Sequence, residues 1–162
     1  MTQPHPATAS HSPTSRPAGW VLRPATDADD DVLAELRAVV LRPDLERLGR
    51  YDEHRVQQRF RDSFSAEHTR IIELGGALAG SITLRPDGDA RLLEHFYLDP
   101  RYQGQGLGTA ILKTVLAEAD AHKATVRLNV LQGSPARRLY ARHGFRLERE
   151  DPIDVFMVRE FL

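Results

Sequence analysis

The sequence predicts an α/β (α+β) fold with a mixed central sheet of about six to seven strands. Short runs that alternate apolar and polar residues indicate strands, and longer segments with apolar residues at helical spacing separate them. A strand, a long helix and a second strand follow one another over residues 91–131, which predicts a right-handed parallel crossover. The expected order of elements is β-α-α-β-β-β-α-β-α-β-β.

The first part of this order is one strand followed by two helices. Residues 20–26 form the strand, and Thr26 or Asp27 can cap the helix that follows. We expect this helix to break near Pro43, because proline lacks the amide that a helix interior needs. A second helix is predicted over residues 51–64, where aromatic and aliphatic residues recur on one face.

A hairpin and a further strand come next. Residues 69–85 contain two β-rich runs around a Gly-Gly pair, and a second turn is predicted at residues 86–88, so these strands should be antiparallel. The following strand, residues 91–98, is closed by an Asp-Pro pair at which ladder pairing stops.

The second half has clearly marked ends. A long helix is predicted over residues 108–122 and a strand over residues 125–131. Residues 134–144 predict a short helix with a serine cap, a proline at its first position and a glycine at its end. Residues 145–161 then alternate apolar and charged side chains as in a final hairpin.

Composition narrows the classes of function. The chain has 162 residues, 41% of them hydrophobic and 28% charged, which fits one domain. Its 22 basic and 23 acidic residues argue against a nucleic-acid or membrane-surface partner. The absence of cysteine excludes a disulfide framework and a thiol nucleophile. Since no membrane span or secretory signal is recognisable, we expect a cytoplasmic protein that acts on a small molecule.

The N-terminal region differs in composition from the rest. Residues 1–19 are mostly Pro, Ser, Thr, Ala and His, so we expect a disordered tail. Residues 20–162 are then the folded domain.

The loop before the long helix contains glycine at positions 104, 106 and 108. Amides at a helix N-terminus lack partners, the helix dipole makes that end positive, and glycine lets an anion approach the main chain. The P-loop lysine is missing after Gly108, and the dinucleotide fingerprint would need glycine at 109 or 111. The loop therefore predicts a phosphate-bearing ligand held in another way.

Two stretches resemble one enzyme family. The segment "LDPRYQGQGLGTAIL" looks like the acetyl-CoA pyrophosphate loop of the GNAT N-acetyltransferase superfamily, with matches at Gln103, Gly106 and Gly108. The segment "SPARRLYARHGF" is similar to the family's later helix, although Ser134 stands where the family typically has asparagine. Its matching residues are Ala136, Leu139, Tyr140, Gly144 and Phe145. The resemblance implies a GNAT-like acyltransferase fold from about residue 20 to the end.

The resemblance also implies where acetyl-CoA, the acyl donor, is bound. The loop amides would hold the diphosphate, and the backbone of residues 96–98 would pair with the pantetheine arm and stabilise the thioester oxygen. Asn129 could face the same cleft or satisfy a neighbouring backbone group, and Arg137 could reach the phosphates or remain solvated. The predicted cofactor-binding residues are Phe96, Leu98, Gln103, Gly104, Gln105, Gly106, Leu107, Gly108, Thr109, Asn129, Ser134 and Arg137.

Direct acetyl transfer to an amine, as in this family, needs an acid near the departing sulfur and a base near the amine. The resemblance assigns the acid to Tyr140, whose alternative role is simple packing in the core.

Glu94 is the predicted base. Regular strand alternation places Glu94, Phe96 and Leu98 on one face, with His95 and Tyr97 on the other. Apolar neighbours would raise the pKa of Glu94 towards the working range of a base. The alternative is a strand carboxylate paired with an arginine, in which case His95 is the reserve base.

The sequence thus predicts an acetyl-CoA-dependent N-acetyltransferase that acts on a primary amine of a small molecule or peptide. The alternative is a non-catalytic acyl-CoA-binding module of the same fold. By resemblance, acceptor specificity should come from residues 41–64 and 150–156, where residues 51–55 could line the entrance or form a solvated helix face. We expect no metal, and a homodimer is one assembly that the chain could form.

Overall fold

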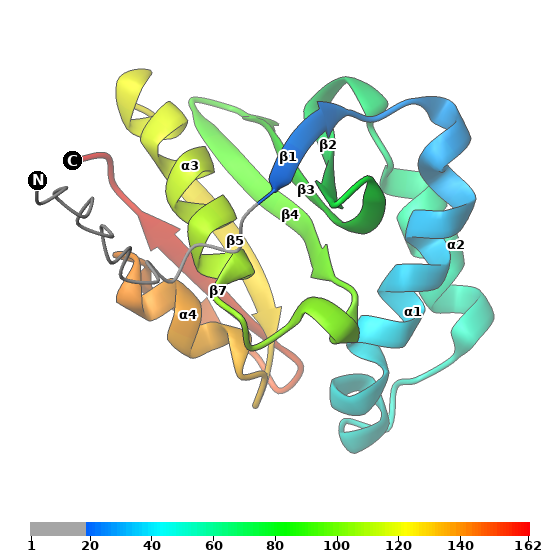
Figure 1. Cartoon of the computed structure of the whole chain (residues 1–162). Helices are drawn as coiled ribbons and strands as arrows, with labels where there is room; N and C mark the ends of the chain where they lie inside the picture. The colour runs from blue at the N-terminus through cyan, green and yellow to red at the C-terminus, as the bar shows by residue number, and fades with distance from the viewer. Residues whose placement is uncertain (1–18) are drawn as a thin grey trace, which may run out of the picture.

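The computed structural model describes residues 19–162, which form a seven-stranded sheet with helices on both of its faces (Figure 1). The strands are β1 (Trp20–Pro24), β2 (Thr69–Leu74), β3 (Ala77–Asp87), β4 (Ala90–Leu98), β5 (Val126–Leu131), β6 (Arg146–Glu150) and β7 (Asp154–Arg159). The helices are α1 (Asp30–Arg47), α2 (Glu53–Ser63), α3 (Leu107–Ala121) and α4 (Ala136–Arg142). Three short 3-10 helices are η1 (Asp27–Asp29), η2 (Ala66–His68) and η3 (Pro100–Tyr102). This order confirms the predicted fold class; the predicted tail, apart from Gly19, lies outside the described residues.

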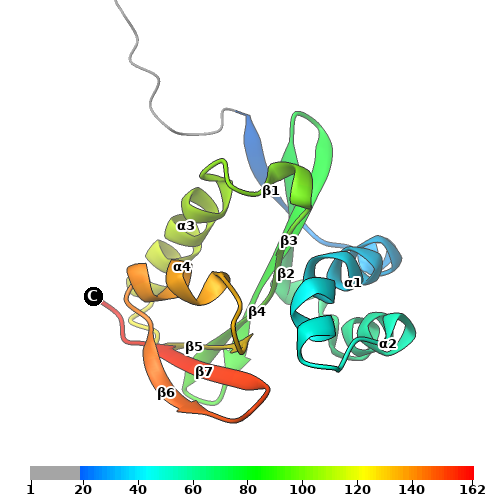
Figure 2. The ribbon, with the colours of Figure 1, turned by 90° about the horizontal axis from the view of Figure 1, so that it is seen from below.

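The sheet runs in the order β1-β2-β3-β4-β5-β7-β6. Neighbouring strands are antiparallel except β4 and β5, which form the predicted parallel crossover. These two strands pair only near their starts, where Arg91 lies opposite Val126 and Leu92 opposite Arg127. Beyond Leu92 they separate, and Figure 2 shows β5, β7 and β6 turned away from β2, β3 and β4. The sheet is therefore split along the C-terminal parts of β4 and β5.

Two helices cover each face of the sheet (Figure 2), and the apolar cores beneath the two pairs differ in size. The α3 face, covered by α3 and α4, holds the larger apolar core, in which Ile111 and Val115 of α3 are fully buried. The α1 face, covered by α1 and α2, holds a smaller core around Leu33 and Phe60. Each such side chain contributes about 1.5–3 kcal/mol when fully buried, so both helix pairs are firmly fixed against the sheet.

The two N-terminal helices differ from the prediction at their ends. α1 continues through Pro43 to Arg47, so the predicted break is wrong. The bond that proline cannot make would join residue 43 to the carbonyl of residue 39 on an exposed part of the helix, where water can replace it. α2 begins only after Asp52, whose side chain accepts a bond from the Arg55 amide (3.0 Å) and caps the helix.

Candidate active site

The loop before α3 presents a row of unbonded backbone amides. Gly104 and Gly106 have φ angles of 73° and 82°, a left-handed conformation that favours glycine. Within residues 19–162, Ala110 is the first residue of α3 whose amide has a backbone acceptor, the carbonyl of Gly106 at 3.1 Å. The amides of residues 104–109 donate to no backbone carbonyl of the described chain, and no side chain caps the helix. Six successive donors at the positive end of a helix form a cradle for an anion.

The side chains of this loop brace its shape. Gln103 Nε2 donates to the Leu98 carbonyl (2.9 Å), and Gln105 Nε2 donates to the Arg101 carbonyl (3.0 Å). A Cβ on Gly108 would lie 3.4 Å from Leu98 Cδ1, an ordinary van der Waals contact, so the start of α3 lies directly beside β4. The glutamines and glycines thus expose the main chain and leave it as the binding surface.

The edge of β4 that faces β5 continues this surface. Since β5 pairs with β4 only up to Leu92, the backbone of residues 93–98 has no strand partner on that side within the described chain. Phe96 and Leu98 are half-buried on the α3 face, and a Cβ on Gly108 would contact both. A strand edge with free amides and carbonyls can pair with an extended, amide-containing chain. The structure therefore brings Phe96, Leu98 and the loop together.

Tyr140 lies on the α3 face, in α4. Its ring is buried and packs edge-on against Phe145, with 5.7 Å between ring centroids. Burial raises the pKa of the Tyr140 phenol, and the nearby Tyr97 adds to the effect. Because its pKa is raised, Tyr140 keeps its proton at neutral pH, and no hydrogen bond joins its hydroxyl to another described residue.

A β-bulge changes which side chains of β4 share a face. Glu94 pairs with Thr83 and Tyr97 with Ser81, so two residues of β4 lie opposite the single residue between Ser81 and Thr83. His95 has a φ of 49° at this point. Gly80 makes the bulge possible, because a Cβ there would lie 1.9 Å from the Tyr97 carbonyl oxygen.

The predicted alternation is therefore wrong for Glu94. Its carboxylate lies 3.8 Å from His95 Nε2. The His95 ring packs against Phe60 of α2, with centroids 4.7 Å apart. Both side chains are thus on the α1 face, whereas Phe96 and Leu98 belong to the α3 face. The extra residue in the bulge adds one step to the alternation, so Glu94 and His95 point the same way.

Glu94 has an arginine partner. Arg85 Nε lies 2.6 Å from Glu94 Oε1 without a well-aligned hydrogen bond, and the Glu94 side chain is 17% exposed. The structure thus contains the alternative arrangement, in which Glu94 is a strand carboxylate paired with an arginine. The apolar neighbours expected around Glu94 are absent on this face because Phe96 and Leu98 point the other way.

His95 belongs to a buried polar network. Its Nε2 lies 2.9 Å from Ser63 Oγ and its Nδ1 3.2 Å from the Tyr97 hydroxyl. That hydroxyl also accepts a bond from Arg37 Nε (3.1 Å). Burial, followed by the positive charges of Arg37 and Arg85, lowers the pKa of His95 to about 4. His95 is consequently neutral at pH 7, with both ring nitrogens in hydrogen bonds.

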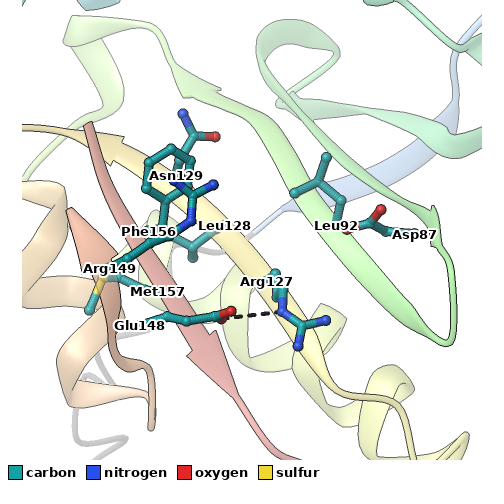
Figure 3. Close-up of a pocket in the computed structure, with 9 residues that line it drawn as sticks. All are labelled: Asp87, Leu92, Arg127, Leu128, Asn129, Glu148, Arg149, Phe156 and Met157. Carbon is teal, nitrogen blue, oxygen red and sulfur yellow. Dashed lines mark hydrogen bonds and ion pairs between the residues drawn. The ribbon is translucent and has the colours of Figure 1, made fainter. Parts of the chain in front are cut away.

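A pocket of about 270 Å³ opens on the sheet surface opposite α3 and α4 (Figure 3). It is lined by Asp87, Leu92, Arg127, Leu128, Asn129, Glu148, Arg149, Phe156 and Met157. Arg127 is paired with Leu92, so continuing this register brings Asn129 level with Glu94 across the separated strands. The pocket thus lies on the same face as the Glu94 carboxylate, next to the split in the sheet.

Comparison with protein families matches residues 33–145, well over half of the chain, to the acetyltransferase (GNAT) family. The chain belongs to this family. Comparison of the GNAT chain with curated proteins gave no match.

Solved structures agree on the fold of this GNAT domain. PaiA N-acetyltransferase from Thermoplasma acidophilum, in complex with coenzyme A, has a TM-score of 0.72 at 21% identity over 88% of this chain and 99% of the other. An acetyltransferase from Thermus thermophilus has a TM-score of 0.69 at 19% identity over 90% and 99% of the two chains. A ribosomal-protein-alanine N-acetyltransferase from Escherichia coli has a TM-score of 0.67 at 19% identity over 88% and 94%.

Three predicted site residues of the GNAT domain are bound to local partners. Asn129 is exposed and donates to Asp154 Oδ1 (3.2 Å), on the face opposite the loop of residues 103–109. Ser134 Oγ accepts from the Ala136 amide (3.3 Å) and so helps to cap α4. Arg137 Nη1 lies 3.9 Å from Glu150. The structure does not bring Asn129 together with the amide cradle.

Sequence reasoning missed several residues that contact Glu94, His95 and Tyr97 in the GNAT domain. Arg37 and Ser63 reach His95 and Tyr97 from helices that are far away in sequence, and no local pattern marks them. Arg85 lies on the strand next to Glu94, but only the register identifies the pair. Gly80 carried a usable signal, since glycine inside a strand often marks a bulge or a close backbone approach.

Residues 19–162 contain neither a membrane-spanning helix nor a group of metal ligands. No helix in that range has the length and apolar character needed to cross a membrane. In the same range, no three His, Cys, Asp or Glu side chains are grouped as metal ligands would be.

Proposed function

We propose that the protein is an acetyl-CoA-dependent N-acetyltransferase that transfers the acetyl group to a primary amine of a small molecule or peptide. Attack is direct, within a ternary complex of enzyme, donor and acceptor. The observation that carries the proposal is the row of free amides at residues 104–109, which leads to the unpaired edge of β4. Membership of the acetyltransferase (GNAT) family supports it, as does the coenzyme A bound by the structurally similar PaiA N-acetyltransferase.

The residues present fit coenzyme A. The amide cradle matches a diphosphate in charge and donor number, and Gly104 and Gly106 leave it open to solvent. The free edge of β4 offers donors and acceptors to the amides of a pantetheine arm. Acetyl-CoA supplies the acetyl group as an activated thioester.

Two side chains handle the protons, each from its own side of the sheet. Tyr140, on the α3 face, retains a proton that it donates to the departing sulfur. Glu94, on the α1 face, accepts the proton of the amine, with water as a carrier where the distance requires it. Arg85 fixes the Glu94 carboxylate, while the low pKa of His95 and its two hydrogen bonds make it a poor substitute. Donor and acceptor then meet at the split between β4 and β5.

Thermal unfolding with acetyl-CoA, followed by an assay of CoA release against a panel of amines, tests this proposal. Ligand at one hundred times its Kd should stabilise the fold by about 2.7 kcal/mol. We expect Tyr140→Phe and Glu94→Gln each to lower kcat by about 100-fold, with the affinity for acetyl-CoA retained. Glu118→Gln, which alters another glutamate paired with an arginine, Arg70 of β2, is the matched control and should leave kcat unchanged.

The same experiment separates the alternatives. Stabilisation by acetyl-CoA without CoA release for any amine would favour a non-catalytic acyl-CoA-binding module. Turnover that neither variant slows would remove the roles of Tyr140 and Glu94 but keep the transferase.

A further inference from the structure

We propose that Arg149, stacked on Phe156, binds a carboxylate carried by the acceptor. The substrate class is then an amine that bears an acidic group several bonds away from the reacting nitrogen. This inference rests on the proposed function, whose acceptor it specifies.

The Arg149 guanidinium is held in a fixed orientation by an aromatic ring. Its Cζ lies 3.7 Å from the centroid of the Phe156 ring, so the planar group is held flat against an aromatic face. Stacking leaves the N–H groups at the edge of the plane free, and these match the two oxygens of a carboxylate. The side chain is thereby oriented before any ligand arrives.

The charges along the pocket wall are unevenly paired. Arg127 Nε lies 3.2 Å from Glu148 Oε2, so that pair neutralises itself (Figure 3). Among residues 19–162, no carboxylate lies within 4 Å of Arg149, so it forms no ion pair, and its charge acts only at longer range on Asp151. Asp87 is the remaining acidic group of the lining, and Figure 3 shows it beside Leu92, across the pocket from Arg149. A bound anion is therefore drawn to the Arg149 end.

The carboxylates near Arg149 in the β6–β7 turn and at the start of β7 already bind other groups. Asp151 accepts from the amides of Ile153 (2.8 Å) and Asp154 (2.7 Å), and these bonds lower the pKa of Asp151. Asp154 accepts from Asn129. These groups are tied to the β6–β7 turn and to β5, so the Arg149 guanidinium remains available to a ligand.

Arg149 lies on the same face of the sheet as Glu94. Phe156 pairs with Asn129, which lies level with Glu94 across the split. Glu94, Asn129 and Phe156 thus form one row across the sheet, with Arg149 stacked over the last of them. In a regular sheet two interstrand spacings, roughly 10 Å, would separate Glu94 from Phe156, and the split between β4 and β5 widens that gap. An acceptor whose amine lies at Glu94 therefore reaches Arg149 only with a carboxylate several bonds away.

Paired acceptors that differ only in one carboxylate test this. Glutamic acid α-amide is compared with glutamine α-amide, and the C-terminally amidated dipeptide Gly-Glu with Gly-Gln, by CoA release at saturating acetyl-CoA. We expect the acid of a pair to exceed its amide about tenfold in kcat/KM. The pair with the larger preference shows whether the carboxylate comes from a free amino acid or from a peptide.

Variants assign the preference to Arg149. Arg149→Ala should raise KM for the acid about tenfold and remove the preference, with kcat within twofold of wild type and the neutral acceptor unaffected. Arg149→Lys keeps the charge but loses the planar fork, so less than half of the preference should remain. Arg146→Ala is the matched control, since Arg146 is an exposed arginine of the same strand that pairs with Glu160 outside the pocket. Equal turnover of acid and amide by the wild type, or an unchanged preference in Arg149→Ala, would overturn the inference.

A binding measurement keeps this test independent of turnover. Calorimetry on the protein with CoA compares N-acetylglutamic acid α-amide with N-acetylglutamine α-amide. One outcome is that the acid binds more tightly than the amide in the wild type but not in Arg149→Ala, while no amine gives CoA release. That result would support the carboxylate site and contradict the proposed transfer reaction. If the two bind equally, the carboxylate site is rejected whatever the assay of CoA release shows.

Discussion

The two faces of β4 present different kinds of binding group, main-chain groups on one and side chains on the other. On the α3 face, the candidate donor site consists of main-chain groups, the amides of residues 104–109 and the free strand edge. On the α1 face, the candidate acceptor site consists of side chains whose positions depend on a bulge and on distant helices. A site made of backbone constrains the sequence mainly through glycine, whereas a site made of side chains can change with each residue. A donor site made of backbone can therefore persist while the sequence changes, whereas an acceptor site made of side chains is particular to one sequence.

The largest expected effect comes from removing the bulge on which the α1 face depends. In Gly80→Ala the new Cβ would lie 1.9 Å from a backbone oxygen of β4, which a side-chain rotation cannot relieve. We expect a loss of about 4 kcal/mol in the free energy of unfolding, measured by urea denaturation. Gly108→Ala is the control, because its Cβ would meet Leu98 at an ordinary 3.4 Å and should cost less than about 1 kcal/mol. Similar costs for both variants would show that the bulge is not a fixed feature.

The next effect is a pH dependence that originates in the network on the α1 face. His95 has a pKa of about 4 when folded, against an ordinary value of 6.5, so the unfolded chain binds the extra proton first as the pH falls. Stability is full above pH 6.5 and is lost between pH 6.5 and 4, by about 3 kcal/mol over the whole range. The measurement is the free energy of unfolding of wild type and His95→Gln at several pH values.

The difference between the two curves of unfolding free energy against pH gives the contribution of His95 alone, without that of the carboxylates. Arginine partners lower the pKa values of Asp29 and Asp120 below the ordinary 3.8. The stability that these two carboxylates contribute is the same in both proteins, so it cancels in the comparison. His122→Gln, an exposed histidine after α3, should reproduce the wild-type curve. A wild-type curve parallel to that of His95→Gln would contradict the network.

A smaller effect tests the α3 face. Gly106 has a φ of 82° and caps α3, so alanine there either strains the loop or changes its shape, at about 1–2 kcal/mol. We expect the Kd for acetyl-CoA to rise about tenfold, measured by calorimetry. Gly75→Ala is matched in conformation, with φ of 58° and open space around it, but it lies in the β2–β3 turn. It should cost similar stability and leave the Kd unchanged; an equal rise in both variants would mean that the cradle does not bind the diphosphate.

The difference between the faces also explains what could be predicted from sequence. The order of elements and the loop of residues 103–108 follow from local patterns, because periodicity, caps and glycine spacing act over a few residues. The face of Glu94 was predicted wrongly because one added residue at His95 reverses the alternation, and the cause, Gly80, lies on another strand. Side-chain partners such as Arg37 and Tyr97, sixty positions apart, become neighbours only through the fold.

The smallest effect concerns a contact that joins the two sides at the open end of the split. Arg47, at the end of α1, pairs with Asp44 (2.7 Å) and donates to the Gln132 carbonyl in the loop between β5 and α4. The backbone of Gly133, with φ of 76°, leaves room for this guanidinium, since a Cβ there would lie 2.7 Å from Arg47 Nη2. The contact therefore bridges the α1 side to the half of the sheet that carries α4.

Because Arg47 is exposed, Arg47→Ala should lower the free energy of unfolding by only about 0.5 kcal/mol. Arg42→Ala, another exposed arginine of α1 that pairs with Glu46 within the helix and lies over the Tyr51 ring, should cost the same. Urea denaturation of both variants provides the comparison. If Arg47→Ala instead lowers the free energy of unfolding by about 2 kcal/mol more than Arg42→Ala does, this contact holds the two halves of the sheet together across the split. The width of the split between the donor and acceptor sides would then depend on Arg47.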